Sequence, residues 1–329
     1  MAHPPVFILS APRSGTTWLV RALSAHPSIH ASELRAFGHH VDVVRDEGAQ
    51  TPRLRITLDA YLDALLNPHS WQPLGSSRES VADDLLRELY EAIRRHAMRH
   101  TGKPFFIDKV TPYHGTSDRV VRTIGRLFPK AKVIHLIRDG RDVAVSGVMH
   151  WLTKDVAGMS EPQRRRRAAV LGNGGAPIDR FFTDVELEQW ASHWREPIDA
   201  IDGTGKSLDR IVVKYEEMSI DLGGELRRIC QFLGVSADDD VLEACLEAST
   251  FEQMSGGRRR GEDAPGAHVR KGVVGDWRRY FTARDASEFD RLAGKLLVAW
   301  GYEQDQRWMT ETPAALALGP GSALSGRRS

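Results

Sequence analysis

An anion-binding loop is indicated near the start of the chain by residues 12–17, PRSGTT. The guanidinium of Arg13 can donate two parallel hydrogen bonds to the oxygens of a phosphate or sulfate group. The hydroxyl groups of Ser14, Thr16 and Thr17 are further donors. Gly15 stands where a helix is expected to begin, and a helix start offers free backbone N–H groups and a dipole that favours negative charge. The loop should therefore bind a phosphate or sulfate group.

The position of its cation separates this loop from a Walker A motif. In GxxxxGK[ST] a Lys follows the last Gly and a Ser or Thr binds Mg²⁺. Here Arg13 precedes Gly15, and Thr16 follows it. The spacing is too short to wrap a β,γ-phosphate pair with a metal. A kinase or other triphosphate-using protein is thus an alternative that the loop disfavours, and a plain helix start is the structural alternative.

Two later segments have the same chemistry. Arg138 ends an apolar run, and Ser146 follows eight residues later, about two helical turns on, so both can face one phosphate. The alternative for this segment, RDGRD, is a set of surface ion pairs. Arg270, Lys271 and Gly272 lie in a Gly-rich stretch that suits a phosphate clamp, and a solvated basic loop is its alternative.

The elements that position these residues alternate between apolar strands and amphipathic helices. This alternation predicts an α/β fold, a P-loop-like three-layer αβα arrangement with a mostly parallel central sheet, whose ligands bind at the carboxyl ends of the strands. One domain is expected over 1–311 and a disordered tail over 312–329. The expected strands are 6–10, 103–107, 132–137 and 210–215, with a loop or short strand at 30–35. The expected helices are 16–25, 58–66, 80–100, 120–128, 187–201, 222–233, 238–248 and 286–302. The Arg- and Gly-rich stretch 161–177 is expected to be a solvated loop that could close as a lid.

Composition narrows the class of protein. The chain has 329 residues, with 45 basic against 44 acidic side chains and a net charge of +1. This balance argues against nucleic-acid and membrane-surface binding. Two cysteines, Cys230 and Cys245, are expected to be buried free thiols, as suits a reducing compartment. The apolar run 6–9 is too short for a signal peptide, so a cytoplasmic protein without membrane insertion is expected.

Taken together, the motifs resemble a known family, the sulfotransferases that use 3′-phosphoadenosine 5′-phosphosulfate (PAPS), particularly the cytosolic type. SAPRSGTTW resembles the family's 5′-phosphosulfate loop, and VIHLIRDGRDVAVS resembles its 3′-phosphate strand and helix. RKGVVGDWRRYFT is similar to its C-terminal RKGxxGDWKxxFT signature, and VVKYEEM and STFEQM also look like the family. The resemblance covers the first two dozen residues and most of 103–302, and it is weak over 37–102.

The resemblance implies roles for individual residues. The 5′-phosphosulfate would be held by Arg13, Ser14, Gly15, Thr16 and Thr17. Trp18 would stack near the adenine, although its place in a helix would otherwise suggest core packing. The 3′-phosphate would be held by Arg138, Ser146, Arg270, Lys271 and Gly272. The adenine pocket would be lined by Tyr215, Thr250 and Phe251, for which buried aromatics are the alternative.

The resemblance offers two candidates for the general base, because branches of the family use different residues. Cytosolic sulfotransferases carry a His in a KTHLP-like segment, where this chain has DKVTP, and His114 lies two residues beyond. Heparan and tyrosylprotein sulfotransferases use a Glu shortly after a His-Pro, which corresponds here to Glu33. We favour Glu33 over His114, and Lys109 could orient the acceptor or the sulfate. Arg13 replaces the usual Lys, as in tyrosylprotein and many bacterial relatives; it keeps the charge but cannot give a proton to the leaving group.

The expected function is sulfuryl transfer from PAPS to a hydroxyl, less readily an amine, of a small-molecule, lipid or sugar acceptor. The transfer would be in line, assisted by a general base, with 3′-phosphoadenosine 5′-phosphate (PAP) as product and no metal. A homodimer is among the expected assemblies. A catalytically silent nucleotide-binding protein of the same fold is a second alternative.

Overall fold

The computed structural model describes residues 3–34, 78–112, 114–153, 159–171, 178–262 and 270–314. The chain divides into two compact units. The first comprises Met1–Ala11, Gly15–Ile137 and Glu196–Ser249, and the second comprises Pro12–Ser14, Arg138–Arg195 and Thr250–Ser329. The expectation of a single domain over 1–311 stays a prediction. The helix expected at 58–66 lies outside the described residues, as does the tail from 315 onward.

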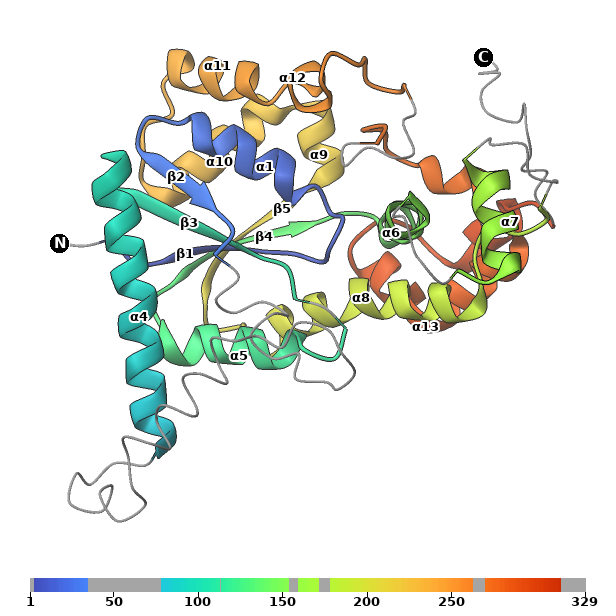
Figure 1. Ribbon diagram of the computed structural model, residues 1–329, viewed down its shortest axis with the longest axis horizontal. Coiled ribbons are helices and arrows are strands. Elements are labelled where there is room, and N and C mark those ends of the chain that lie inside the picture. The colour runs from blue at the N-terminus through green and yellow to red at the C-terminus, as the bar shows by residue number, and fades with distance from the viewer. Residues whose placement is uncertain are drawn as a thin grey trace. The chain divides into compact units, whose positions relative to one another are not determined.

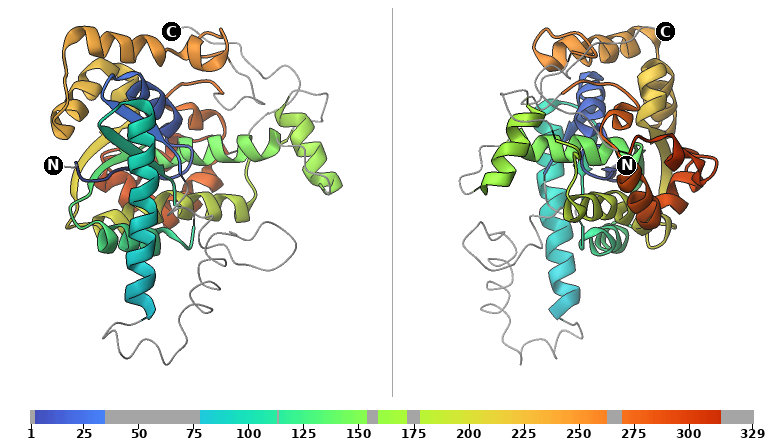
Figure 2. Two further views of the ribbon diagram at one scale, coloured as in Figure 1. Left: turned by 60° about the vertical axis from the view of Figure 1, so that its left-hand side comes forward. Right: turned by 90° about the vertical axis from the view of Figure 1, so that its right-hand side faces the viewer.

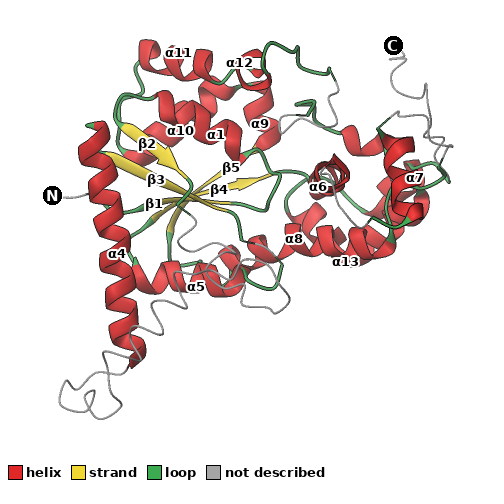
Figure 3. Ribbon diagram, in the orientation of Figure 1, coloured by secondary structure: helices red, strands yellow, loops and turns green. Residues whose placement is uncertain are grey.

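A five-stranded parallel sheet forms the centre of the first unit. Its strands are β1 (Val6–Leu9), β2 (Ile29–Ser32), β3 (Phe105–Val110), β4 (Lys132–Ile137) and β5 (Asp209–Lys214), in the order β2-β3-β1-β4-β5. Figure 3 shows them as one sheet. Side chains of β1 and β4 are buried on both faces, which explains their continuous apolar runs. The expected parallel α/β fold is confirmed, and β3 begins two residues later than predicted.

Helices cover both faces of this sheet. One face carries α1 (Thr16–Ala25), α10 (Leu222–Leu233) and α11 (Asp239–Ala248), and the other carries α4 (Arg78–Thr101) and α5 (Ser117–Leu127) (Figure 1). The short α9 (Tyr215–Ile220) follows β5 directly. Part of α4 extends well beyond the sheet (Figure 2). The buried cluster beneath α4 and α5 takes alternate residues of the strands and includes Phe7, Leu9, Val110, Val133, Tyr90, Val121 and Ile124.

The second unit is mainly helical. It contains α6 (Gly140–Thr153), α7 (Glu161–Val170), α12 (Phe251–Ser255) and α13 (Ala283–Ala299), the 3₁₀ helices η2 (Asp276–Arg279) and η3 (Gln306–Glu311), and most of α8 (Asp184–Asp202). A capping box of Thr282 and Asp285 starts α13. The core is aromatic, with buried side chains of Phe181, Phe182, Trp190, Trp194, Trp277, Phe281, Phe289 and Trp308.

The prediction of a loop over 161–177 is wrong for its first part, which forms α7. The reason is local: Ser160 and Gln163 make a capping box, a proline occupies the first turn, and Arg164 and Arg165 pair with Glu161. Residues 172–177 lie outside the described part. Both cysteines are buried free thiols, as predicted. Within the described residues, none of the helices has the length and apolar content needed to cross a bilayer.

Candidate functional site

In the first unit, Gly15 forms the turn between β1 and α1. Its φ of 95° lies in the left-handed region, and its carbonyl accepts the N–H groups of Trp18 and Leu19 at 3.0 and 3.2 Å. A Cβ at this position would lie 2.5 Å from Cδ2 of Tyr215. Both the backbone conformation and the close approach of the tyrosine ring therefore require glycine. The helix start that follows offers the N–H groups expected of an anion site.

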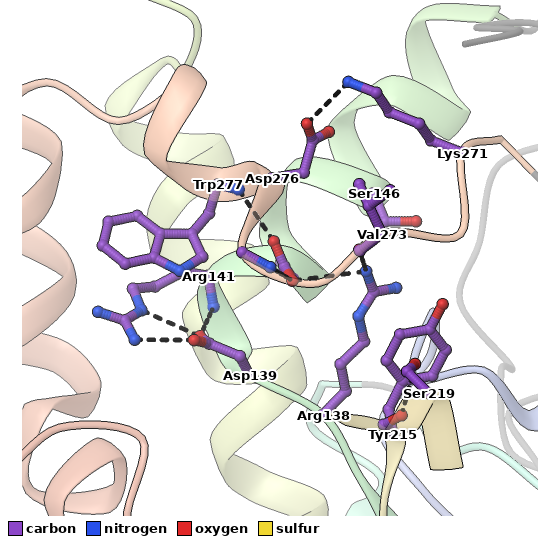
Figure 4. Close-up of polar contacts among 12 residues, drawn as sticks. Arg138, Asp139, Arg141, Ser146, Tyr215, Ser219, Lys271, Val273, Asp276 and Trp277 are labelled. Carbon is purple, nitrogen blue, oxygen red and sulfur yellow. Dashed lines mark hydrogen bonds and ion pairs between the residues drawn. The ribbon is translucent and has the colours of Figure 1, made fainter. Parts of the chain in front are cut away.

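Next to this turn lies an aromatic pair formed by Trp18 and Tyr215. The ring centroids are 5.6 Å apart with an interplanar angle of 70°, an edge-to-face arrangement. The indole N–H of Trp18 donates to the carbonyl of Ser249 at 3.0 Å. The hydroxyl of Ser219 donates to the carbonyl of Tyr215 at 2.9 Å (Figure 4). Both rings are buried. Burial of both side chains also agrees with core packing, the alternative role considered for them in the sequence analysis.

The first candidate base, Glu33, immediately follows β2. Its carboxylate lies 2.8 Å from Nζ of Lys109 on β3, and the two side chains are 33% and 13% exposed. Ser32 and Asp108 are register partners of these neighbouring strands, so the chain continues past β2 alongside Lys109. The structure thus brings together two of the residues to which the sequence assigned catalytic roles.

The second candidate base, His114, lies in a separate pair. Its Nδ1 is 2.5 Å from Oε1 of Glu196, and Oε2 of the same carboxylate accepts the N–H of Gly115 at 2.6 Å. His114 is more exposed than Glu33, at 52% of its side chain. A carboxylate on Nδ1 orients the imidazole ring. His114 stays the alternative prediction for the base.

In the second unit, Arg13 is the only non-glycine residue in the described chain with a positive φ, at 68°. Its Nε donates to Oγ of Ser146 on α6 at 3.3 Å, and its carbonyl accepts from Nη1 of Arg138 at 3.3 Å. Strained backbone of this kind is concentrated at ligand sites. The adjacent hydroxyl of Ser14 is fully buried and has no hydrogen-bond partner among the described residues. Residues from the first two basic motifs are thus in contact.

Arg138 also reaches the third basic motif. Its Nη2 donates to the carbonyl of Val273 at 3.3 Å and lies 3.6 Å from the carboxylate of Asp142 (Figure 4). Asp142 in turn accepts the N–H groups of Gly275 and Trp277 at 2.8 and 2.9 Å. Burial raises the pKa of Asp142, and Arg138 opposes this shift. A buried carboxylate at the start of α6 therefore holds residues 272–277, the GxxGDW loop, in place.

The cations of the third motif share one acidic partner. Lys271 lies 2.9 Å from Asp276, and Arg270 donates to the other oxygen of the same carboxylate. Burial alone would raise the pKa of Asp276, but Arg270 and Lys271 hold it below its usual value. The two cations are therefore held at fixed positions by a carboxylate that stays ionised.

Beside these cations, the loop closely approaches an aromatic ring. A Cβ on Gly272, whose φ is 69°, would lie 2.6 Å from Cε2 of Phe251. The guanidinium of Arg258 lies 5.6 Å from the centroid of the same ring and donates to the carbonyl of Arg270 at 2.8 Å. Thr250 caps α12 through its side chain, which accepts the N–H of Gln253 at 3.3 Å. Its role in the fold is thus a helix cap next to Phe251.

The alternative of surface ion pairs in RDGRD is wrong. Arg141 is 1% exposed and pairs with both Asp139 and Glu303. Its guanidinium lies 3.8 Å from the ring centroid of Trp277 and 4.6 Å from that of Trp308. These charges are buried because the aromatic core of the second unit surrounds them.

Three acidic residues had no role in the sequence analysis: Asp108, whose Oδ1 accepts the N–H of Leu34 beside Glu33, Asp142 and Asp276. Their contacts are with partners far along the chain or across a loop. The i,i+4 spacing of Arg138 and Asp142 was a usable signal for one of them. The other two needed the register of the strands and the path of the loop.

A glycine turn that leads from the first strand of a parallel α/β sheet into a helix defines the class of protein, a P-loop-like three-layer fold. The sequence model of the family described as the sulfotransferase domain matches residues 3–301. The chain therefore belongs to the sulfotransferase domain family.

Among its relatives, the chain is 30% identical to sulfotransferase 2A6 of Mus musculus over 206 residues, which cover 58% of this chain and 66% of that protein. It is 29% identical to sulfotransferase 2A1 of Homo sapiens over 181 residues, covering 51% and 59%. The matched part thus spans less than two thirds of either relative. The crystal structure of mouse sulfotransferase SULT7A1 complexed with PAP superimposes with a TM-score of 0.50 at 17% identity, covering 94% of this chain and 89% of that one. This likeness shows the shared fold.

Proposed function

We propose that this protein is a PAPS-dependent sulfotransferase. It would move the sulfuryl group of PAPS to a hydroxyl, less readily an amine, of a small-molecule, lipid or sugar acceptor, and release PAP. The observation that carries the proposal is the contact network of Arg138, which links the carbonyl of Arg13 to that of Val273 in the GxxGDW loop. Three motifs far apart in the sequence thereby present their cations within one unit, as recognition of a nucleotide with separated anionic groups requires.

The residues of the second unit fit the anionic part of such a donor. Arg138, Ser146, Arg270, Lys271 and Gly272 would hold the 3′-phosphate, and Arg13 and Ser14 would contact the 5′-phosphosulfate. The buried Ser14 hydroxyl supports this assignment because it lacks a hydrogen-bond partner among the described residues, and a phosphate or sulfate oxygen would satisfy it. Phe251 and Thr250 would contact the adenine.

In the first unit, Gly15, Thr16 and Thr17 would offer hydrogen-bond donors at the start of α1. Trp18 and Tyr215 would face the adenine. Tyr215 packs against Gly15 so closely that no side chain fits between them, which supports a turn shaped for a ligand. Each of these roles follows the family resemblance, and the local geometry is compatible with it.

The chemistry follows from charge. The donor supplies the sulfuryl group, and negative charge builds on its leaving phosphate, where Arg13 and the loop N–H groups would stabilise it. Glu33 would accept the proton of the attacking hydroxyl. Lys109, which is 2.8 Å from Glu33, would fix the carboxylate and orient the acceptor or the sulfuryl group. His114, held by Glu196, is the alternative base.

Calorimetry tests the nucleotide. PAP and ATP would be titrated into the protein, each with and without Mg²⁺. The proposal expects PAP to bind more tightly than ATP and without a Mg²⁺ requirement. Equal or tighter binding of ATP, or dependence on Mg²⁺, would favour the triphosphate-using alternative. Incubation of radiolabelled PAPS with a cell extract, followed by identification of the labelled product, would then give the acceptor.

Separate substitutions test the base. Glu33→Gln is expected to lower kcat at least tenfold, and His114→Ala to lower it less than threefold. Glu88→Gln, an exposed glutamate on α4 that pairs only loosely with Arg95 at 3.7 Å, is the matched control and should leave kcat unchanged. If neither Glu33→Gln nor His114→Ala slows turnover tenfold, both base assignments are wrong. If His114→Ala alone does so, His114 is the base.

We further propose that the enzyme acts in the cytoplasm as a homodimer and binds no nucleic acid. The two buried free thiols support a reducing compartment, and a net charge of +1 offers little attraction for a polyanion. Light scattering after size-exclusion chromatography would determine the oligomeric state.

A further inference from the structure

A buried carboxylate lies directly beneath the segment that carries Glu33. Asp108, on β3, has no solvent exposure. Its Oδ1 accepts the backbone N–H of Leu34 at 2.9 Å. Because β2 ends at Ser32, this N–H belongs to the first turn of chain beyond the ladder of strand hydrogen bonds. The contact therefore ties down a segment that the sheet itself no longer holds.

Two adjacent residues of β3 thus contact the two residues that follow β2. Asp108 binds the backbone of Leu34, and Lys109 binds the side chain of Glu33 at 2.8 Å. Successive side chains of a strand point to opposite faces, so the two attachments come from different directions. The two attachments together restrict both the path of the backbone and the rotamer of Glu33. The salt bridge alone would leave the backbone unrestrained.

We propose that Asp108 is a positioning residue for the sulfuryl transfer, which sets the position of Glu33 by holding the N–H of Leu34. This inference rests on the proposed function, because it takes Glu33 as the base. Asp108 would not touch the substrates. A displacement of the reacting groups by about 1 Å can cost on the order of 100-fold in rate, so a group that only fixes the backbone can have a large effect.

The ionisation of Asp108 gives this role a measurable signature. Burial raises the pKa of Asp108 to about 7; the N–H of Leu34, the hydroxyl of Tyr90 on α4 and Lys109 act in the opposite direction, and the charge of Glu33 raises it further. Among the described titratable groups, Glu33, Tyr90 and Lys109 act on it most strongly. Below pH 7 the carboxyl group gains a proton and becomes a weaker acceptor for the N–H of Leu34. Turnover should therefore fall as the pH drops through about 7.

The decisive variant is Asp108→Asn, which has nearly the same shape and still accepts a hydrogen bond but does not titrate. We expect kcat to fall at least tenfold, the inflection of kcat near pH 7 to disappear, and the Kd for PAP to stay within twofold of the wild-type value. A residue that merely supported the fold would instead lower PAP binding and turnover together and leave the shape of the pH profile unchanged.

A second pair of variants covers the case in which Asp108→Asn does not fold. Leu34→Pro removes the N–H while Asp108 stays in place, and Leu34→Ala keeps the N–H. The inference expects Leu34→Pro to lower kcat at least tenfold relative to Leu34→Ala, and equal rates in the two variants would overturn it. If Glu33→Gln lowers kcat tenfold but Asp108→Asn leaves kcat and the pH profile unchanged, only the role of Asp108 is wrong. If Glu33→Gln is fully active, the base assignment is wrong and the inference falls with it.

Discussion

Gly272→Ala would test whether the basic loop must approach the ring of Phe251 as closely as it does. The added Cβ would lie 2.6 Å from Cε2 and 2.7 Å from Cδ2 of that ring. Carbon atoms pack at about 3.5 Å or more, so the loop and the ring would have to separate by roughly 1 Å. Phe251 and Gly272 are both proposed to contact the nucleotide. A shift of this size should therefore weaken nucleotide binding.

Gly102→Ala is a matched control. Gly102 has the same φ of 69°, but a Cβ there meets nothing within 4 Å. Alanine in this conformation costs about 1–2 kcal/mol at either position, so both variants should lose that much stability. Only Gly272→Ala adds the displacement of the ring. We expect its Kd for PAP to rise at least tenfold, about 1.4 kcal/mol, whereas that of Gly102→Ala should stay within twofold of wild type.

Two measurements separate these effects. Urea denaturation gives the free energy of unfolding of each variant, and isothermal titration calorimetry gives its Kd for PAP. If Gly272→Ala loses the same stability as Gly102→Ala and binds PAP as tightly as the wild-type protein, the ring and the loop do not form part of the nucleotide site. That outcome would refute the assignment of Phe251 and Gly272.

Two further substitutions address charged residues of the second unit. Asp142→Ala leaves the buried N–H groups of Gly275 and Trp277 and the cation of Arg138 without this acceptor, so the free energy of unfolding should fall by about 3–5 kcal/mol, as measured by urea denaturation; a loss below about 1 kcal/mol would contradict the buried network. Arg13→Ala should lower kcat/KM at least 100-fold in a steady-state assay, whereas Arg13→Lys, which keeps the charge, should stay within tenfold; equal losses in both would show that the fork, not the charge, is needed.

Elements whose signals are local could be predicted from the sequence. The helix α10 has the predicted bounds, Leu222–Leu233, because Gly234 adopts the left-handed conformation that ends it. The strand β4 has the predicted bounds because its apolar run is bracketed by charged residues. The helix α7 was missed although Ser160 and Gln163 carry a capping signal, since the arginine run and the glycines beyond it suggested a loop.

The candidate site was predictable only in part for a related reason. Motif residues can be recognised by their type and spacing. Arg13 does contact the side chain of Ser146, and Arg138 does contact the carbonyl of Arg13. The acidic residues that support the site are harder to predict. Asp108 accepts the backbone N–H of a residue 74 positions away, and Asp142 accepts that of a residue 133 positions away, so no local pattern encodes these two contacts. Only the i,i+4 pair of Asp142 with Arg138 is local.

The contacts of Arg141 extend the second unit beyond the end of the family match. The family match stops at residue 301, yet Glu303 and Trp308 lie beyond it and hold Arg141, which also packs on Trp277 of the GxxGDW segment. A chain that ended at residue 301 would keep every sequence motif. It would lose the side chains of Glu303 and Trp308, which contact Arg141 where it packs on Trp277. The second unit therefore includes aromatic and ionic contacts made by residues beyond the family match.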